Sequence, residues 1–268
     1  MTPDDGPIYA QAALSGAGKV GAETDVWPAL AKQHLWNALC IAALCKTRED
    51  GLIAQGKQNI DYEVRGLAMV AIAAAAAFVE SLINEVFRAA QNSVGSDLIA
   101  GIPPAVVETM GALWDPPAAP EVQRSRWCRA WAELRGIQLN PPKVKPLRLK
   151  PTLDKYEAAL EAVGQPKVMP KGQGTWQQVR MVFNLRNALV HYTPEWQGVT
   201  ANQVSSQFNQ VPTSRQTPHA GFPSNLLNAD AARWACDVCR GFVVEWSAHM
   251  GLTSPIDTNF QAGDWPTP

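Results

Sequence analysis

Hydrophobic positions recur at helical spacing in several separate segments of the chain. The pattern predicts helices over residues 26–48, 62–91, 105–113, 123–135, 152–163, 175–192 and 228–250. No segment alternates polar and apolar residues as a half-buried strand does. We therefore expect an all-α helical bundle in one domain over residues 25–250, with a flexible N-terminal arm over 1–24 and an irregular C-terminal tail over 251–268.

The predicted helix over 62–91 changes character halfway along. Its first half is apolar on every side, as expected for a central buried helix, and the run from Leu67 to Val79 is too short to span a bilayer. Its second half is amphipathic, and Glu80 and Asn84 stack on one face because they lie four residues apart.

Glycine, proline and polar residues mark the breaks between helices. We expect Gly51 and Gly56 to end the first helix and Thr175 to be the N-cap of the helix over 175–192. Residues 193–227 form a long polar loop, and loops of that length are usually functional or disordered. The connector over 140–151 contains four prolines, which exclude a regular helix.

Charge is distributed unevenly although the formal net charge is only −1. Residues 124–186 contain 13 Lys and Arg against 4 Asp and Glu, so the middle of the chain is basic and its flanks are acidic. A basic segment suits a polyanionic partner such as RNA. Equally, the acidic flanks can fold over the basic middle and neutralise it. The candidate RNA-binding side chains are Lys143, Lys145, Arg148, Lys150 and Arg180.

Five cysteines do not form a disulfide framework in a chain of this size. The lone Cys236-x-x-Cys239 pair lies in a predicted helix without a second pair, which favours a structural role over a metal or redox role. The start of the chain is acidic and no apolar signal region follows it. We expect a cytoplasmic protein that has no membrane partner.

The most informative side chains lie near the end of the helix over 175–192. At 100° per residue, Arg186 falls near the middle of a broad apolar face, and Asn187 and His191 stack together at its edge. A buried guanidinium needs a carboxylate or several other acceptors. The candidate partner is Glu80, or else the face is shared with a second copy of the chain and Arg186 lies in a cleft between the copies.

The run Leu185-Arg-Asn-Ala-Leu-Val-His191 resembles the R-N-x-x-x-H form of the signature of HEPN domains. The segment from Phe78 to Asn84 is similar to the first core helix of many HEPN proteins, in which an acidic residue often faces the motif. The resemblance implies a HEPN-like bundle, here with an extra N-terminal helix and a long loop before the last helix.

HEPN domains typically dimerise, and many are metal-independent ribonucleases. The resemblance therefore implies a homodimeric endoribonuclease that cleaves RNA through the 2′-hydroxyl without metal or other cofactor. His191 would act as general acid or base, Arg186 would bind the scissile phosphate, and Asn187 would orient the histidine or bind phosphate. Glu80, Asn84 and Tyr192 would support them. A toxin or defence effector of this kind would have an antitoxin or regulatory protein as a partner.

Two alternatives remain open. The toxin-type pattern has tyrosine two residues after the histidine, whereas here Tyr192 follows His191 directly and Thr193 stands in that place. This departure argues against a partner nucleotidyltransferase that modifies the tyrosine. HEPN folds without activity are also common, so the chain could be a non-catalytic HEPN-like module that binds nucleic acid or a protein. The motif could also be purely structural, with Arg186 in an ion pair and His191 placed favourably in the last turn of its helix.

Overall fold

The computed structural model describes residues 30–92, 97–115, 146–191, 207–217 and 222–252. These residues contain helices and loops and no strand, which confirms the all-α prediction. The α-helices are α1 (Leu30–Ala54), α2 (Tyr62–Asn92), α3 (Pro104–Trp114), α5 (Thr152–Ala162), α6 (Gly174–Val190) and α8 (Ala229–Met250). Short 3-10 helices cover Asp97–Ile99, Leu147–Leu149 and Ser224–Leu226. The predicted arm, the helix over 123–135 and the tail beyond residue 252 lie outside the described residues.

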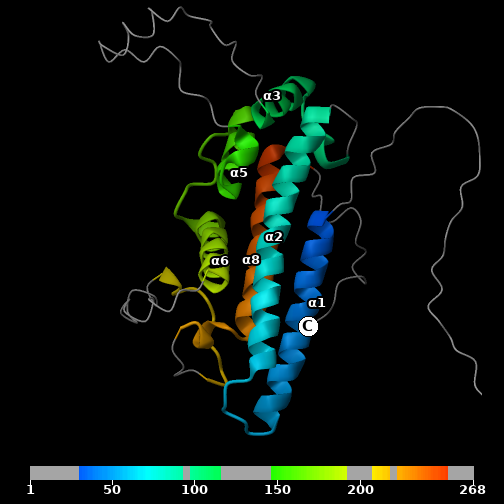
Figure 1. Ribbon diagram of the computed structural model, residues 1–268. Helices are drawn as coiled ribbons and strands as arrows, with labels where there is room; N and C mark the ends of the chain where they lie inside the picture. The colour runs from blue at the N-terminus through cyan, green and yellow to red at the C-terminus, as the bar shows by residue number, and fades with distance from the viewer. Residues whose placement is uncertain (1–29, 93–96, 116–145, 192–206, 218–221, 253–268) are drawn as a thin grey trace, which may run out of the picture.

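Helix α2 is the centre of the bundle, as its apolar first half predicts. It contacts α1, α3, α5, α6 and α8. In Figure 1, α1 and α2 form a long antiparallel hairpin, α8 lies behind α2, and α5 and α6 follow each other along the side opposite α1. Helix α3 crosses the end of α2 and covers that end of the bundle. Helix α6 lies beside the middle of α2.

Side chains that cap helices set several of the boundaries. Asn228 precedes α8, and its Oδ1 accepts a hydrogen bond from the backbone N–H of Ala231 at 2.9 Å. Gly251 ends α8 with φ of +73°, a left-handed conformation that glycine adopts without strain. The expectation that Gly51 ends the first helix is wrong, because α1 continues through it to Ala54. Gly56 follows with φ of +68°.

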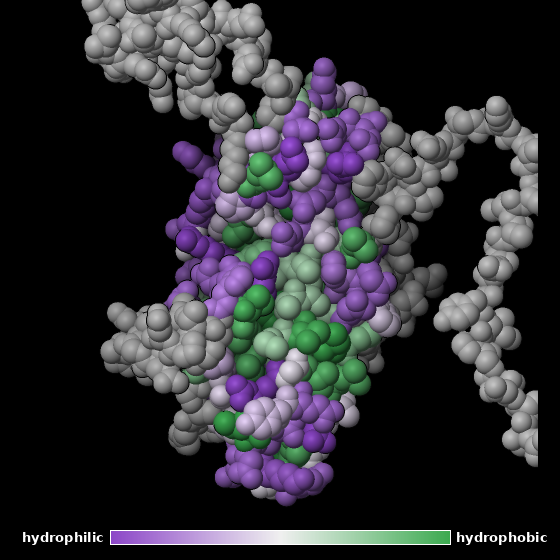
Figure 2. Space-filling model, in the orientation of Figure 1, coloured by the Kyte–Doolittle hydropathy of each residue, from purple (hydrophilic) through white to green (hydrophobic). Residues whose placement is uncertain are grey.

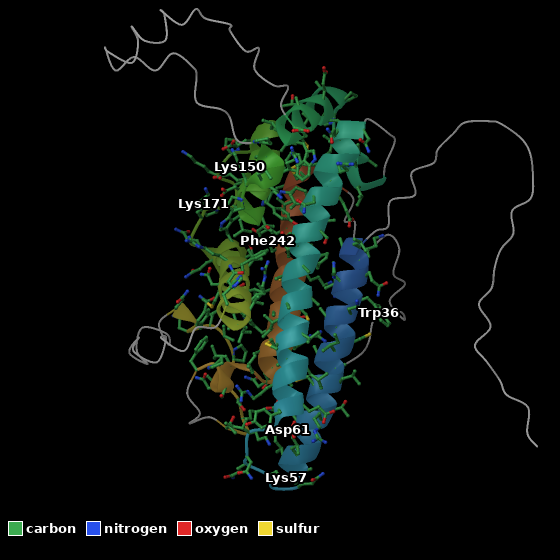
Figure 3. The ribbon with its side chains drawn as sticks, viewed as in Figure 1. Trp36, Lys57, Asp61, Lys150, Lys171 and Phe242 are labelled. Carbon is green, nitrogen blue, oxygen red and sulfur yellow. The ribbon has the colours of Figure 1, made fainter. Side chains whose placement is uncertain are left out.

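Aromatic rings join α5, α6 and α8 behind α2. The ring of Tyr156 meets the rings of Phe242 and Trp246 edge-on, with 4.9 Å between centroids in both pairs. Trp176 of α6 reaches the other side of Phe242, which Figure 3 shows between the helices. The hydroxyl of Tyr156 donates to the backbone carbonyl of Val79 at 2.8 Å. This cluster fixes α6 against the centre of the bundle.

Two glutamates accept hydrogen bonds from backbone N–H groups at the N-termini of other helices. Glu85 of α2 accepts from the backbone N–H of Ala31, and Glu49 of α1 accepts from that of Ala229, each at 2.9 Å. The positive end of a helix favours a carboxylate at such a position. Burial nevertheless raises the pKa of both carboxyl groups. Glu49 is only 1% exposed.

The long polar stretch before α8 contributes to the core where the structure describes it. Phe208 and Val211 are buried, and Arg215 forms ion pairs with Asp50 of α1 and Asp230 of α8 at 3.2 and 3.1 Å. Residues 207–217 therefore tie the end of α1 to the start of α8. Residues 193–206 and 218–221 lie outside the described residues.

The cysteines of the C-x-x-C pair lie within α8, as the sequence indicates. Cys236 and Cys239 are both buried, and burial raises the pKa of the Cys236 thiol to about 12 and that of Cys239 above its usual range. Both thiols therefore stay protonated at neutral pH and pack as small apolar side chains.

Helix α2 is long and apolar enough to cross a membrane, a property that it shares with the core helices of many soluble proteins. Half of its most apolar window is buried inside the bundle. On its outer side, Met69 and Val70 are exposed, and Ala73 and Ala77 are partly exposed one and two turns further on. We call these four residues the α2 stripe; Figure 2 shows hydrophobic surface over this part of the molecule.

Candidate functional site

Arg186 of α6 forms an ion pair with Glu80 of α2. The guanidinium Nη2 lies 3.2 Å from the carboxylate Oε2, so the partner expected from the sequence is confirmed. The side chains are 27% and 45% exposed, so this pair lies at the surface of the α2–α6 contact and not in the core. The guanidinium carbon also lies 5.8 Å from the centroid of the Phe183 ring.

The expectation that Arg186 lies in the middle of the buried face of α6 is wrong. The buried residues of α6 are Trp176, Val179, Met181, Val182, Leu185 and Ala188. Two further apolar residues of the helix do not join them, because Phe183 is only partly buried and Val190 is exposed. The buried arc is consequently rotated toward Leu185, and Arg186 lies on its flank, where it is partly exposed to water.

Asn187 and His191 are exposed side chains at the C-terminal end of α6. His191 is the C-cap residue, and its backbone N–H donates to the carbonyl of Asn187 at 2.9 Å. The helix ends at Val190, two residues before the predicted bound, and the imidazole stands at the negative end of the helix. Tyr192 lies outside the described residues. The start of α6 differs from expectation: its N-cap is Gln173, and the hydroxyl of Thr175 donates to the carboxylate of Glu245.

Lys155 of α5 belongs to the same cluster and was missed from the sequence. Its Nζ donates to Oδ1 of Asn84 at 2.7 Å, and its ammonium lies 5.3 Å from the centroid of the Trp114 ring. The residue is only 4% exposed. Burial lowers the pKa of Lys155, and the negative charge of Glu80 acts in the opposite direction.

A signal for Lys155 was present in the sequence. Lys155 and Ala159 lie four residues apart, hence on one face of the predicted helix. A lysine on the apolar face of an amphipathic helix needs an acceptor nearby. Asn84, which the sequence placed beside Glu80, is that acceptor. We call Glu80, Asn84, Lys155 and Arg186 the polar cluster.

The candidate RNA-binding residues do not form one set in the structure. Lys150 and Arg180 are exposed, and Figure 3 shows Lys150 on the side of the bundle that bears α5. Arg148 forms an ion pair with Asp115 at 3.4 Å, which partly neutralises it. Lys143 and Lys145 lie outside the described residues. The sequence left open whether the basic segment binds a polyanion or is neutralised by acidic residues of the chain. Neutralisation applies to Arg148, whereas Lys150 and Arg180 have no ion pair within the described ranges.

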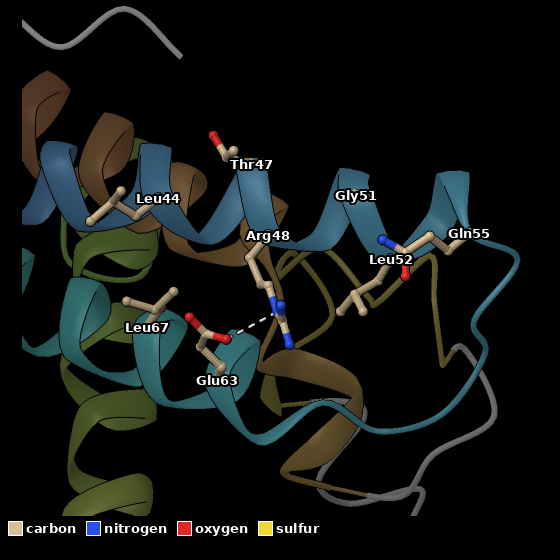
Figure 4. Close-up of a pocket in the computed structure, with 8 residues that line it drawn as sticks. All are labelled: Leu44, Thr47, Arg48, Gly51, Leu52, Gln55, Glu63 and Leu67. Atoms are coloured by element: carbon tan, nitrogen blue, oxygen red, sulfur yellow. Dashed lines mark ion pairs between the residues drawn. The ribbon is translucent and has the colours of Figure 1, made fainter.

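A separate pocket lies between the end of α1 and the start of α2, with a volume of about 400 Å³ (Figure 4). Its lining residues are Leu44, Thr47, Arg48, Gly51, Leu52, Gln55, Glu63 and Leu67. Arg48 and Glu63 form an ion pair across its edge at 3.0 Å. Glu63 and Glu80 lie roughly 25 Å apart along α2 at 1.5 Å per residue, so the pocket is not part of the polar cluster.

No family model, curated protein or solved structure matches the chain. Within the described ranges, no group of three or more His, Cys, Asp or Glu side chains is arranged to hold a metal ion. The strongest chemical feature of the described residues is therefore the polar cluster together with the exposed Asn187 and His191.

Proposed function

We propose that the protein is a HEPN-like, metal-independent endoribonuclease whose site is built on the C-terminal half of α6. The observation that supports this most directly is the position of Arg186. It is held by Glu80 at 3.2 Å and still partly exposed, in the same two turns of helix as the exposed Asn187 and His191. A cation and an imidazole on one accessible helix end suit phosphodiester cleavage.

The reaction would use the ribose as its own nucleophile. The 2′-oxygen attacks phosphorus while its proton passes to an imidazole, the bond from phosphorus to the 5′-oxygen breaks, and that oxygen receives a proton. The products are a 2′,3′-cyclic phosphate and a 5′-hydroxyl end. Arg186 would stabilise the charge that develops on the non-bridging oxygens, and Asn187 would bind phosphate or orient His191.

A homodimer would supply the second imidazole that separate acid and base roles require, because the described residues of one copy carry one histidine at this site. The α2 stripe supports this arrangement. It is apolar, its large side chains Met69 and Val70 are exposed, and one turn beyond Ala77 it reaches Glu80 of the polar cluster. A second copy that covers the stripe would bring its own Arg186 motif toward the first.

The test is cleavage of RNA in the presence of EDTA by the wild-type protein and by the His191→Ala variant. His249→Ala is the matched control, because His249 lies in the last turn of α8 and outside the proposed site. The proposal requires cleavage that H249A retains and H191A loses. Salt-dependent RNA binding without cleavage would identify a non-catalytic module instead. Equal cleavage by all three proteins would show that His191 has no role.

A further inference from the structure

Glu80 is one carboxylate beside two cations. It contacts Arg186 directly at 3.2 Å, and its charge also acts on Lys155. Within the described residues Lys155 forms no ion pair, and its only hydrogen-bond acceptor is the neutral amide oxygen of Asn84. The polar cluster therefore holds two positive charges and one negative charge, and the unneutralised charge is the buried ammonium of Lys155.

This imbalance matters for any anion that binds Arg186. Glu80 contacts the guanidinium through Nη2 alone, so a phosphate that engages that side of Arg186 competes with the Glu80 carboxylate, and the negative charge of Glu80 repels the phosphate. Glu80 is half exposed, and Asn84, which accepts from Nζ of Lys155, lies one helical turn from it on the same face of α2, so Lys155 is the second cation beside Glu80.

We propose that Lys155 is a positioning residue, an inference that rests on the proposed function. When Arg186 engages an RNA phosphate, Lys155 replaces it as the ion-pair partner of Glu80. Lys155 does not touch the RNA. Glu80 is then neutralised in both states, by Arg186 before binding and by Lys155 during it, so that Arg186 is held in place first and released afterwards. Burial of Lys155 under Trp114 keeps the ammonium on the protein side of the cluster, where solvent does not reach it.

The test measures the affinity for a short 2′-O-methyl RNA, which binds but is not cleaved because its 2′-oxygen carries no proton. Lys155→Met removes the charge and keeps an unbranched chain beside Trp114, while Lys155→Gln also keeps a donor for Asn84. The second variant serves if the first does not fold. We expect both to raise Kd about tenfold, the loss of roughly one near-surface charge interaction. The control Lys46→Met breaks an exposed ion pair with Asp50 on α1 and should change Kd by less than about twofold.

A second substitution separates action through Glu80 from direct attraction of the phosphate. Glu80→Gln removes the competitor for Arg186, so adding Lys155→Met to it should cost no further affinity. An equal loss of affinity in both backgrounds would overturn the proposal, because Lys155 would then act on the RNA directly. No loss in either background would also overturn it.

Thermal unfolding tests the same coupling without RNA, so that failure of the proposed nuclease function is distinguishable from failure of this inference. In the Lys155→Met background, Glu80 depends on Arg186 alone. Arg186→Met should therefore lower Tm by about 1–2 °C more in that background than in the wild type. Equal losses would show that Lys155 and Arg186 do not share Glu80, whether or not the protein binds RNA.

Discussion

The substitution Arg186→Met tests whether the guanidinium acts in RNA cleavage or only stabilises the fold. Methionine keeps an aliphatic chain beside Phe183 and removes only the charge and its hydrogen bond to Glu80. That bond is a single contact of 3.2 Å between side chains that are 27% and 45% exposed. Water screens such a pair, so its contribution to the free energy of unfolding is about 0.5–1 kcal/mol.

The size of the protein converts that energy into a small change in Tm. At roughly 2–4 °C per kcal/mol for a domain of this length, Arg186→Met should lower Tm by about 1–4 °C. Its effect on RNA cleavage should be far larger, on the order of a hundredfold or more, because a cation that stabilises developing charge is typically worth that much. We therefore predict a small loss of thermal stability and a large loss of cleavage activity for Arg186→Met.

The assay combines thermal unfolding with RNA cleavage in EDTA, and Arg48→Met is the matched control. The side chain of Arg48 is 43% exposed and forms ion pairs with Asp61 and Glu63, each at 3.0 Å, far from the polar cluster. It should lose a similar amount of stability and no activity. A fall in Tm of more than about 8 °C for Arg186→Met, with activity lost in proportion to the folded fraction, would mean that Arg186 is a structural ion pair.

Three further predictions concern the scaffold. Tyr156→Phe should cost about 1–2 kcal/mol of unfolding free energy in urea titrations, because it removes the buried 2.8 Å hydrogen bond to Val79; an unchanged midpoint would contradict this. Asn228→Ala should cost at least about 1–2 kcal/mol, because it removes the N-cap hydrogen bond and the two hydrogen bonds that Nδ2 donates to the carbonyls of Pro212 and Asn225; Asn228→Asp should not restore this stability, because a buried carboxylate oxygen would then face those carbonyls. Burial raises the pKa of Glu49 in the fold, so its stabilising contribution is full below the ordinary value of 4.5 and is lost as pH rises through the raised pKa. The Tm of Glu49→Gln relative to wild type should therefore increase from pH 4.5 to pH 7.5, and a constant difference would refute the argument.

Hydrophobic periodicity was sufficient to locate most of the helices. The prediction over 62–91 corresponds to α2 at Tyr62–Asn92, and the prediction over 228–250 corresponds to α8 at Ala229–Met250. Both helices carry strong local signals: a long apolar run in α2, and an N-cap asparagine followed by a terminal glycine in α8. Gly51 misled the prediction because a single glycine costs a helix only about 1 kcal/mol, which the packing of the α1–α2 hairpin outweighs.

The candidate site was only partly predictable. The pairing of Arg186 with Glu80 followed from the need of a guanidinium near an apolar face for a carboxylate, and from the polar face that Glu80 and Asn84 share on the central helix. The exposure of Arg186 did not follow, because it depends on how far α6 is rotated about its own axis. Lys155 was missed because its acceptor lies 71 residues away in the chain, on α2.

The sequence alone therefore determined the helices, their order and the identity of the chemical groups at the end of α6, because these depend on local periodicity, capping residues and side-chain chemistry. Only the tertiary structure decided how exposed those groups are and which further side chain joins them. The rotation of α6 puts Arg186 at the surface, and the approach of α5 to α2 places Lys155 beside Asn84. Such contacts arise from the packing of whole helices, in which a rotation of a few tens of degrees moves a side chain between core and solvent.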